Sequence, residues 1–534
     1  MSSQASFHGR FAAASIVVCA ATIAASCSSE TPPEGDAAQS SLSGQSSLNG
    51  VVLGPEGPLG EARVRIKGQS ESTLTNANGA FTLTLSGSAP YRVVASKSGF
   101  LIAGTDARPG QEVKLHLARH PHVDNASYAW VDPRPDPNSA GQCANCHQEI
   151  YREWSTSAHA GSVSDLHFLN IYDGGDWHGN EDIGWNLLRD MPEGSGVCFS
   201  CHAPSLPVSS SAVNDLRRAS GVHRQGVHCD YCHKVSDVAT KDVGIDHGRF
   251  ATSLLRPSGA EQLFFGPLDD VDRGEEVHVP LYKDSRYCAA CHEGVLFSTH
   301  AYSTYSEWLA SPSARRGVQC QNCHMAPTGS LTNFAPGAGG IERDPKTLAS
   351  HAMRGADLET LKSCLSLELV VAPTADGFDL RTEVRTHDVG HCVPTGHPSR
   401  ELILHVRAVD AAGAPLPLIK GPTLPATAGI GSAAEGNLAG EPGKLYAKQL
   451  ESFDGRQPVP YWTVCRVAAD TRLKPDARDL LSFRFARRGD TAKVSAALLF
   501  RRFNKSVADE KGWPDNELVV IRKQWQTSRP PQLP

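Results

Sequence analysis

One five-residue pattern recurs five times in the middle of this 534-residue chain, and no other feature constrains the fold as strongly. Each copy has two cysteines separated by two residues, and a histidine follows the second cysteine directly. Ten of the 15 cysteines belong to these copies, so the fold must place ten thiols and five imidazoles in suitable positions. The copies are Cys143–His147, Cys198–His202, Cys229–His233, Cys288–His292 and Cys320–His324.

This spacing is the one used for covalent attachment of c-type haem. Two thiols add to the vinyl groups of one porphyrin, and the adjacent histidine reaches the iron from one face. Zinc is the alternative, because zinc sites also use cysteine pairs two residues apart. Five copies fit zinc poorly, since a zinc site takes four ligands from paired knuckles and needs no histidine after every second cysteine. The sequence therefore predicts five covalently bound haems c.

The predicted residues follow from the pattern. The thioether cysteines are Cys143, Cys146, Cys198, Cys201, Cys229, Cys232, Cys288, Cys291, Cys320 and Cys323. The proximal iron ligands are His147, His202, His233, His292 and His324.

Composition and charge limit the remaining possibilities. With 40% hydrophobic and 20% charged residues, the chain is globular and long enough for roughly two to four domains. The net charge of −6 argues against a nucleic-acid partner. Covalent haem attachment takes place outside the cytoplasm, so the chain needs an export signal.

The N-terminus supplies such a signal at residues 1–27. An apolar run, Phe11–Ala25, is too short to cross a membrane comfortably and is typical of a signal-peptide core. The segment Ile23–Cys27 resembles the lipobox of bacterial lipoproteins, which implies lipidation of Cys27; cleavage without lipid is the alternative. Ser28 after that cysteine favours the outer membrane over the inner one. Residues 28–47 read as a flexible linker.

A small β module is expected at residues 48–118. Short strands at 51–53, 62–66, 80–85 and 91–95 are separated by turns rich in glycine, proline and asparagine, which suggests a small antiparallel sandwich. The segment resembles the carboxypeptidase regulatory-like (transthyretin-like) domain through Pro58–Val64, Thr75–Phe81 and Ser96–Phe100. We expect it to act as a spacer or docking module.

Residues 119–362 hold the five copies and leave little room for a hydrophobic core of their own, so the porphyrins must supply buried apolar surface. We expect short helices joined by long irregular segments. The region resembles the multihaem cytochromes of the c-554 and c-552 group in the hydroxylamine oxidoreductase superfamily. The residues that carry this resemblance are Cys146–Trp154 with Ser157–Ala160, Gly226–His233, Tyr305–Trp308 and Gln319–Met325. The resemblance implies electron transfer between closely stacked haems.

The second axial ligand decides what each iron can do. Beyond the signal peptide only Met191, Met325 and Met353 could supply sulfur, so histidine on both faces is the default. The resemblance implies that His159, His351 and His391 are such distal ligands. Two haems remain without one. The candidates are His178, His223, His228, His247, His278 and His300, with His247 and His300 ranked slightly first.

The last part, residues 363–528, changes to the alternation typical of half-buried strands. We expect an antiparallel β-sandwich, with the turn Pro394–Arg400 placing His391 against a haem. Cys364, Cys392 and Cys465 allow one disulfide in an oxidising compartment. Three pairings are open, and Cys364–Cys465 is a guess.

Three functions follow as alternatives. The first is an electron carrier of the cell envelope, in the periplasm or at the outer membrane, that serves redox protein partners. The second is a reductase or oxidase of a small nitrogen or sulfur compound at one open haem. No motif ends in lysine, so the pattern of the ammonia-forming nitrite reductases does not apply. The third is an envelope binding or scaffold protein. The sequence leaves enzyme activity, redox partners, oligomeric state and exposure at the cell surface open.

Overall fold

The computed structural model describes residues 47–139, 141–192, 197–208, 214–259, 261–486 and 492–526. Cys27, the predicted signal peptide and nearly all of the predicted linker lie outside the described residues. Lipidation of Cys27 therefore stays a prediction.

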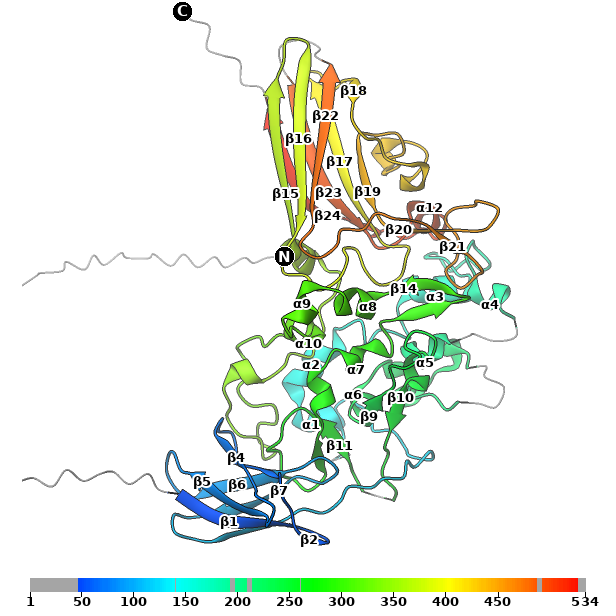
Figure 1. Ribbon diagram of the computed structural model, residues 1–534. Coiled ribbons are helices and arrows are strands. Elements are labelled where there is room, and N and C mark those ends of the chain that lie inside the picture. Colours follow the sequence, from blue (N-terminus) through cyan, green and yellow to red (C-terminus); the bar gives the residue numbers. More distant parts are fainter. Residues whose placement is uncertain are drawn as a thin grey trace, which may run out of the picture. The chain divides into compact units, whose positions relative to one another are not determined.

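Two four-stranded sheets form the N-terminal module (Figure 1). Strands alternate as expected: in β5, Phe81 and Leu83 are buried between exposed neighbours. One pair differs from the predicted antiparallel pattern, because β8 runs parallel to β1. The chain reaches β8 from β7 in the opposite sheet, so it need not reverse beside β1. The strands are β1 Ser47–Gly54, β2 Gly57–Pro58, β3 Arg63–Ile66, β4 Ser72–Leu74, β5 Ala80–Thr84, β6 Tyr91–Ser96, β7 Ala103–Ala107 and β8 Val113–His116.

Ion pairs join this module to the haem-motif region. Asp272, whose side chain is 2% exposed, accepts from Lys67 and from Arg92, each at 2.7 Å. Two cationic partners offset the cost of removing the Asp272 carboxylate from water, so these ion pairs can hold the N-terminal module against the haem-motif region.

Short helices and irregular segments make up the motif region, as predicted. Four motifs begin a helix of about one turn, and the fourth motif, Cys288–His292, overlaps the end of helix α7, Arg286–Ala289. The α-helices are α1 Cys143–Cys146, α2 Gln148–Ser155, α3 Leu166–Asp173, α4 Leu187–Asp190, α5 Cys198–His202, α6 Cys229–Cys232, α7 Arg286–Ala289, α8 Thr304–Leu309, α9 Pro312–Arg315 and α10 Cys320–His324. The short strand pairs are β9 Val235–Val238 with β10 Thr252–Leu254, β11 Phe264–Gly266 with β12 Glu276–His278, and β13 Gly294–Leu296 with β14 Thr299–Tyr302.

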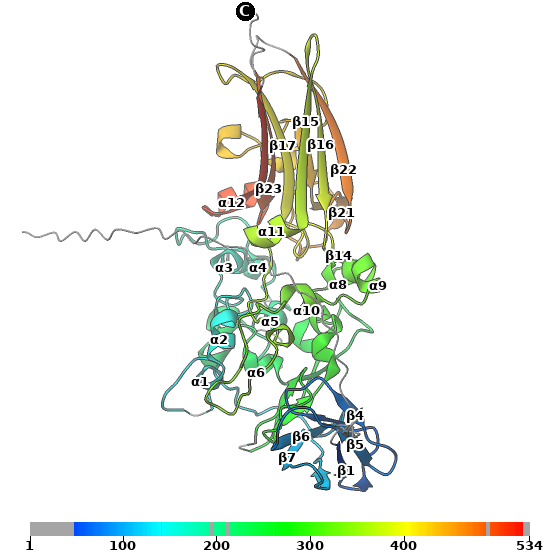
Figure 2. The same ribbon diagram turned by 90° about the vertical axis from the view of Figure 1, so that its left-hand side faces the viewer.

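The C-terminal part is an antiparallel sandwich of two four-stranded sheets, as predicted (Figures 1 and 2). Its core is apolar: Leu380, Val384, Leu402 and Leu404 are fully buried. The six long strands coincide with the alternating segments of the sequence. They are β15 Leu365–Pro373, β16 Gly377–Thr386, β17 Glu401–Asp410, β22 Arg478–Ala486, β23 Ala492–Arg501 and β24 Glu517–Gln526.

Shorter elements complete the C-terminal part. They are α11 Leu358–Cys364, β18 Leu418–Lys420, β19 Gly443–Tyr446, β20 Lys448–Glu451, β21 Arg466–Asp470 and α12 Lys505–Glu510. Strands β20 and β21 pair outside the two large sheets. Single 3₁₀ turns lie at Leu216–Arg218, Gly221–Gln225, Gly248–Phe250, Pro280–Lys283, Pro345–Thr347, Ala426–Ala428 and Ala433–Glu435.

The predicted disulfide is wrong. Cys364, Cys392 and Cys465 are all free thiols. Cys364 packs against the main core of the sandwich, whereas Cys465 lies in a separate small cluster with Leu450 and Val459. Because the two thiols belong to different cores, the Cys364–Cys465 bridge does not form.

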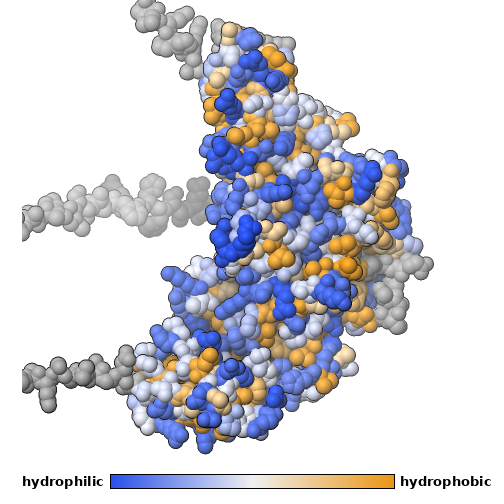
Figure 3. Space-filling view, in the orientation of Figure 1, coloured by the Kyte–Doolittle hydropathy of each residue, from blue (hydrophilic) through white to orange (hydrophobic). Residues whose placement is uncertain are grey.

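The surface in Figure 3 mixes hydrophilic and hydrophobic residues over all the described regions that it shows. Within the described ranges, every helix is too short or too polar to cross a bilayer.

Candidate haem sites

One connected cavity of about 2850 Å³ runs through the motif region. A pocket for a single small ligand holds about 300–1,000 Å³, so this cavity has room for several large groups. All ten motif cysteines and all five motif histidines line it. The predicted distal ligands His159, His351 and His391 line it as well.

Four of the motif histidines are held in the same way. In each, Nδ1 bonds to a backbone carbonyl, which leaves Nε2 as the free nitrogen. Outer hydrogen bonds of this kind orient histidines that bind metals. The contacts are His147 to Phe334 at 2.8 Å, His202 to Ser162 at 2.7 Å, His233 to Phe265 at 2.7 Å and His324 to Arg354 at 2.5 Å.

Two motif histidines face a second imidazole at a distance that fits one iron between them. The rings of His292 and His159 have centroids 6.1 Å apart, and those of His324 and His391 are 6.0 Å apart. Metal–nitrogen bonds to histidine are about 2 Å long, so two imidazoles on opposite faces of one iron have centroids about 6 Å apart. The ring planes meet at 68° in the first pair and at 16° in the second. Both pairs therefore fit a haem ligated by two histidines.

His351 lies near two motif histidines. It interacts electrostatically with His233 and then His147, and burial lowers the pKa of its imidazole to about 4. Burial likewise lowers the pKa of His292 to about 3. Both rings are neutral at pH 7, which is the form that binds a metal ion.

Cysteines of different motifs lie close enough to influence one another's pKa. The thiol of Cys229 lowers the pKa of Cys143. The thiol of Cys291 likewise lowers the pKa of Cys201. The thiol of Cys288 lowers the pKa of Cys320 to about 7. The first motif thus lies against the third, the second against the fourth, and the fourth against the fifth.

Three histidines considered for the remaining haems do not face the cavity. His247 is 3% exposed and is absent from the cavity lining. His300 binds the buried carboxylate of Glu293 through Nε2, the nitrogen an iron would need. His178 is exposed to solvent at the end of a turn. The structure brings none of them to a motif histidine.

Other cavity residues escaped the sequence reasoning. His397 lines the cavity, and its buried Nδ1 has no hydrogen-bond partner. Arg400 and Tyr461 line it too, and Tyr461 interacts electrostatically with Cys198 and Arg400. All three come from the C-terminal part. The only signal for His397 and Arg400 was the turn Pro394–Arg400, which the sequence suggested as a support for His391, and no pattern pointed to Tyr461.

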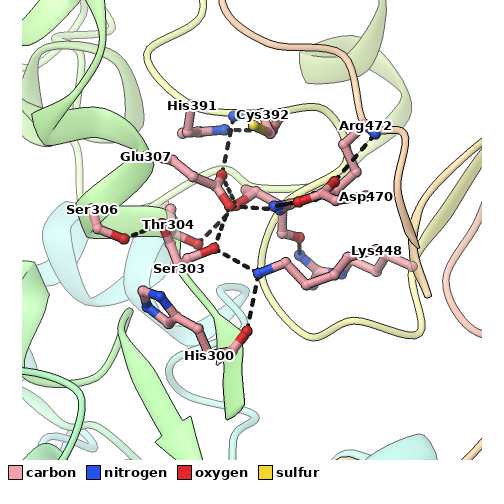
Figure 4. Close-up of polar contacts among 12 residues, drawn as sticks. His300, Ser303, Thr304, Ser306, Glu307, His391, Cys392, Lys448, Asp470 and Arg472 are labelled. Atoms are coloured by element: carbon pink, nitrogen blue, oxygen red, sulfur yellow. Dashed lines mark hydrogen bonds and ion pairs between the residues drawn. The ribbon is translucent and has the colours of Figure 1, made fainter. Parts of the chain in front are cut away.

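A polar network binds the His391 segment to helix α8 (Figure 4). One oxygen of Glu307 accepts from the Cys392 backbone amide at 3.1 Å and from the Thr395 hydroxyl at 2.8 Å. The other oxygen accepts from Ser303 and from Arg472, each at 2.6 Å. His391 itself bonds through Nδ1 to the Cys392 carbonyl at 3.0 Å.

The zinc alternative has no support in the described ranges. There, no three histidine, cysteine, aspartate or glutamate side chains gather closely enough to hold a metal ion among themselves. Pairs of cysteines with a histidine facing a shared cavity fit haem instead.

Comparison with known proteins agrees with these sites. Residues 47–118 match the carboxypeptidase regulatory-like domain, and residues 142–234 match the family of cytochrome c554 and c-prime. No significant match was found among curated proteins.

Two solved structures are similar to parts of the chain. The penta-heme cytochrome c552 from Thermochromatium tepidum has a TM-score of 0.52 at 20% identity, over 72% of this chain and 97% of that one. At this identity the likeness shows the fold. A cohesin–X–dockerin complex from Acetivibrio cellulolyticus has a TM-score of only 0.12 at 18% identity, over 13% of this chain and 51% of that one.

Both predicted resemblances are confirmed. Residues 47–118 are similar to the carboxypeptidase regulatory-like domain, residues 142–234 are similar to cytochrome c554 and c-prime, and the fold is similar to that of the penta-heme cytochrome c552.

Proposed function

We propose that this protein is a five-haem electron carrier of the cell envelope. The single cavity lined by all ten motif cysteines and all five motif histidines is the observation that carries the proposal. Each cysteine becomes a thioether on its own porphyrin, so two neighbouring cysteines of different motifs bring the edges of two porphyrins together. Cys143 lies beside Cys229, which links the first motif to the third. Cys232 interacts electrostatically with Cys288 and Cys291, which links the third motif to the fourth. Cys288 lies beside Cys320, which links the fourth motif to the fifth. The second motif joins at the fourth.

Haem supplies a one-electron couple whose potential depends on its axial ligands and surroundings. The chain's own residues hold that couple in place. Carbonyls orient the proximal imidazoles through Nδ1, and His159 and His391 face His292 and His324 at ligand spacing. We infer that these four histidines ligate two irons, and that His351 ligates the haem of the third motif, with His233.

The fifth motif is the surface end of the proposed path. Cys323 is the one exposed cysteine among the ten motif cysteines, all of which lie in described ranges. By contrast, the two residues between the cysteines are buried in the second, third and fourth motifs. A partner could therefore approach the fifth haem most closely, which makes it the expected point of electron exchange.

A reductive titration tests the carrier function. We expect the purified protein to take up five electrons per chain, and we expect electrons that enter at one haem to redistribute over all five. Rapid-mixing spectroscopy with a substoichiometric donor would follow the redistribution. A haem that exchanges electrons only through added mediators would contradict one connected path.

Localisation adds a second prediction. Replacing Cys27 by serine should release the protein from membranes into the soluble envelope fraction, because the lipid attachment site is lost. Fractionation followed by immunoblotting measures this. A Cys27→Ser protein that stays with the membrane would show that lipid is not the anchor.

A second candidate function is chemistry at an open haem of the second motif. No described imidazole faces His202 at the spacing of the two pairs above, and the ring beside it is Phe168, stacked at 3.9 Å. Arg400 lines the same cavity, donates to the Thr395 carbonyl at 2.9 Å, and has no carboxylate partner among the described residues. A partly buried guanidinium without an acidic partner favours an anion nearby.

Carbon monoxide distinguishes this candidate. An open haem should bind it in the reduced protein and give at least one haem equivalent of the bound spectrum, since the first motif also has no assigned distal ligand, whereas five closed haems should bind none. If binding occurs, Arg400→Met should weaken the binding of small oxyanions to the oxidised protein. Unchanged anion binding in Arg400→Met would assign that guanidinium to a haem propionate instead.

A further inference from the structure

Glu307 lies where the motif region meets the C-terminal sandwich, and its carboxylate accepts four hydrogen bonds. Its side chain is 9% exposed, and that of its ion-pair partner Arg472 is 5% exposed. Both of its oxygens accept two hydrogen bonds, from Cys392, Thr395, Ser303 and Arg472. A buried carboxylate that is paired and fully hydrogen-bonded is held in one geometry.

The partners of Glu307 are themselves fixed. Arg472 binds Asp470 through two nitrogens, at 2.8 and 2.7 Å. Lys448 donates to Ser303 at 2.7 Å and is 6% exposed. The cluster therefore combines two acids, Glu307 and Asp470, with two cations, and its formal charge is zero (Figure 4). Because these charges balance, Glu307, Arg472 and Lys448 can lie nearly buried, whereas the side chain of Asp470 is 39% exposed.

The segment that Glu307 holds carries His391. Its bond to the amide of Cys392 fixes the peptide next to that histidine, and its bond to the Thr395 hydroxyl fixes the following turn. Gly390 packs on the ring of Trp308, the neighbour of Glu307 in helix α8, and a Cβ at Gly390 would come within 3.1 Å of that ring. Helix α8 therefore contacts the chain on both sides of His391 in the sequence, at Gly390 before it and at Cys392 and Thr395 after it.

We propose that Glu307 is a positioning residue that sets the plane of the His391 imidazole relative to that of His324, and thereby the electronic state of the haem between them. The proposal rests on the ligation inferred above. The two planes lie 16° apart, against 68° in the His159 and His292 pair. Imidazole planes that are near parallel or near perpendicular give low-spin ferric haem different electron paramagnetic resonance anisotropy, so the two haems should be distinguishable.

The alternative is that Glu307 only stabilises the fold. Terminal torsions of imidazole side chains have broad minima, so a loosened segment would let His391 turn about its own axis without leaving the iron. A structural role alone would change stability and leave the ring angle as it is. The anisotropy of the electron paramagnetic resonance signal distinguishes a positioning role from a structural role, because it depends on the angle between the two imidazole planes and not on the stability of the protein.

The test compares Glu307→Ala and Glu307→Gln with wild type in the purified holoprotein. Glu307→Ala should move one haem equivalent of the near-parallel low-spin signal to a different anisotropy and shift one midpoint potential. Glu307→Gln keeps the volume and one acceptor oxygen, so it should lie between alanine and wild type. Glu149→Gln is the matched control, because that carboxylate lies on the exposed side of helix α2 and pairs with Arg152.

The outcomes separate the two proposals. If Glu307→Ala leaves every resonance signal and potential unchanged while His391→Ala changes one haem, Glu307 does not position the ligand. If His391→Ala also changes nothing, the ligation itself is wrong. Haem content and thermal unfolding of each variant would identify a protein that has merely lost its fold.

Discussion

Replacing His391 by alanine should convert one of the low-spin haems to high-spin, in a protein that still folds and keeps all its haems. The imidazole faces His324 at 6.0 Å between ring centroids, which is the spacing of two ligands on one iron. Losing it leaves the iron with a single histidine, and an iron with one strong axial ligand changes spin state and potential. Visible spectroscopy and electron paramagnetic resonance measure both effects.

His387→Ala is the control for that variant. Its side chain lies only four residues away in the sequence, is 45% exposed and does not line the cavity. It should leave all the haem spectra unchanged. A folded His391→Ala protein with unaltered Soret and α bands would mean that His391 only hydrogen-bonds within its own segment.

Replacing Lys511 by methionine should cause the largest loss of stability. The ammonium group is fully buried and donates to four backbone carbonyls, those of Asn170, Gly175, Ile183 and Trp185. Methionine fills the space and satisfies none of these acceptors. Each unsatisfied buried acceptor costs about 1–3 kcal/mol, and some relaxation is expected, so we predict a loss of about 3 kcal/mol or more in the free energy of unfolding.

The carbonyls that Lys511 holds belong to the segment beside the second motif, where Phe168 stacks on His202. The second haem should therefore respond in Lys511→Met before the others do. Chemical denaturation followed at the haem bands measures the loss. Lys493→Met, an exposed position on β23, is the control, and equal unfolding midpoints in the two variants would contradict the role of the buried ammonium.

Periodicity and motif spacing predicted a good part of this molecule. The five haem motifs and the six long strands of the C-terminal sandwich are legible in the sequence because each depends on residues close together in the chain. The N-terminal sandwich was also expected, but the parallel pairing of β1 with β8 was not. That pairing depends on which sheet edge the chain reaches after β7, and no local pattern encodes it.

Distal ligands show the same limit. The resemblance implied His159 as a distal ligand but did not say of which haem, and its ring faces His292 of the fourth motif. His247 and His300 were ranked slightly above the other candidates, but His247 does not line the cavity and His300 binds the carboxylate of Glu293. Glu307 was visible only as part of a resemblance. Its role depends on Cys392, Thr395 and Arg472, which lie 85 or more positions away.

Mass spectrometry of the intact protein after denaturation and acid–acetone extraction tests the central claim most directly. Five covalent haems should remain on the chain, because ten motif thiols line one cavity beside five histidines. The expected mass is that of the processed polypeptide plus five haem groups. Haem that is extracted by the solvent, or a mass with fewer than five groups, would contradict a five-haem carrier.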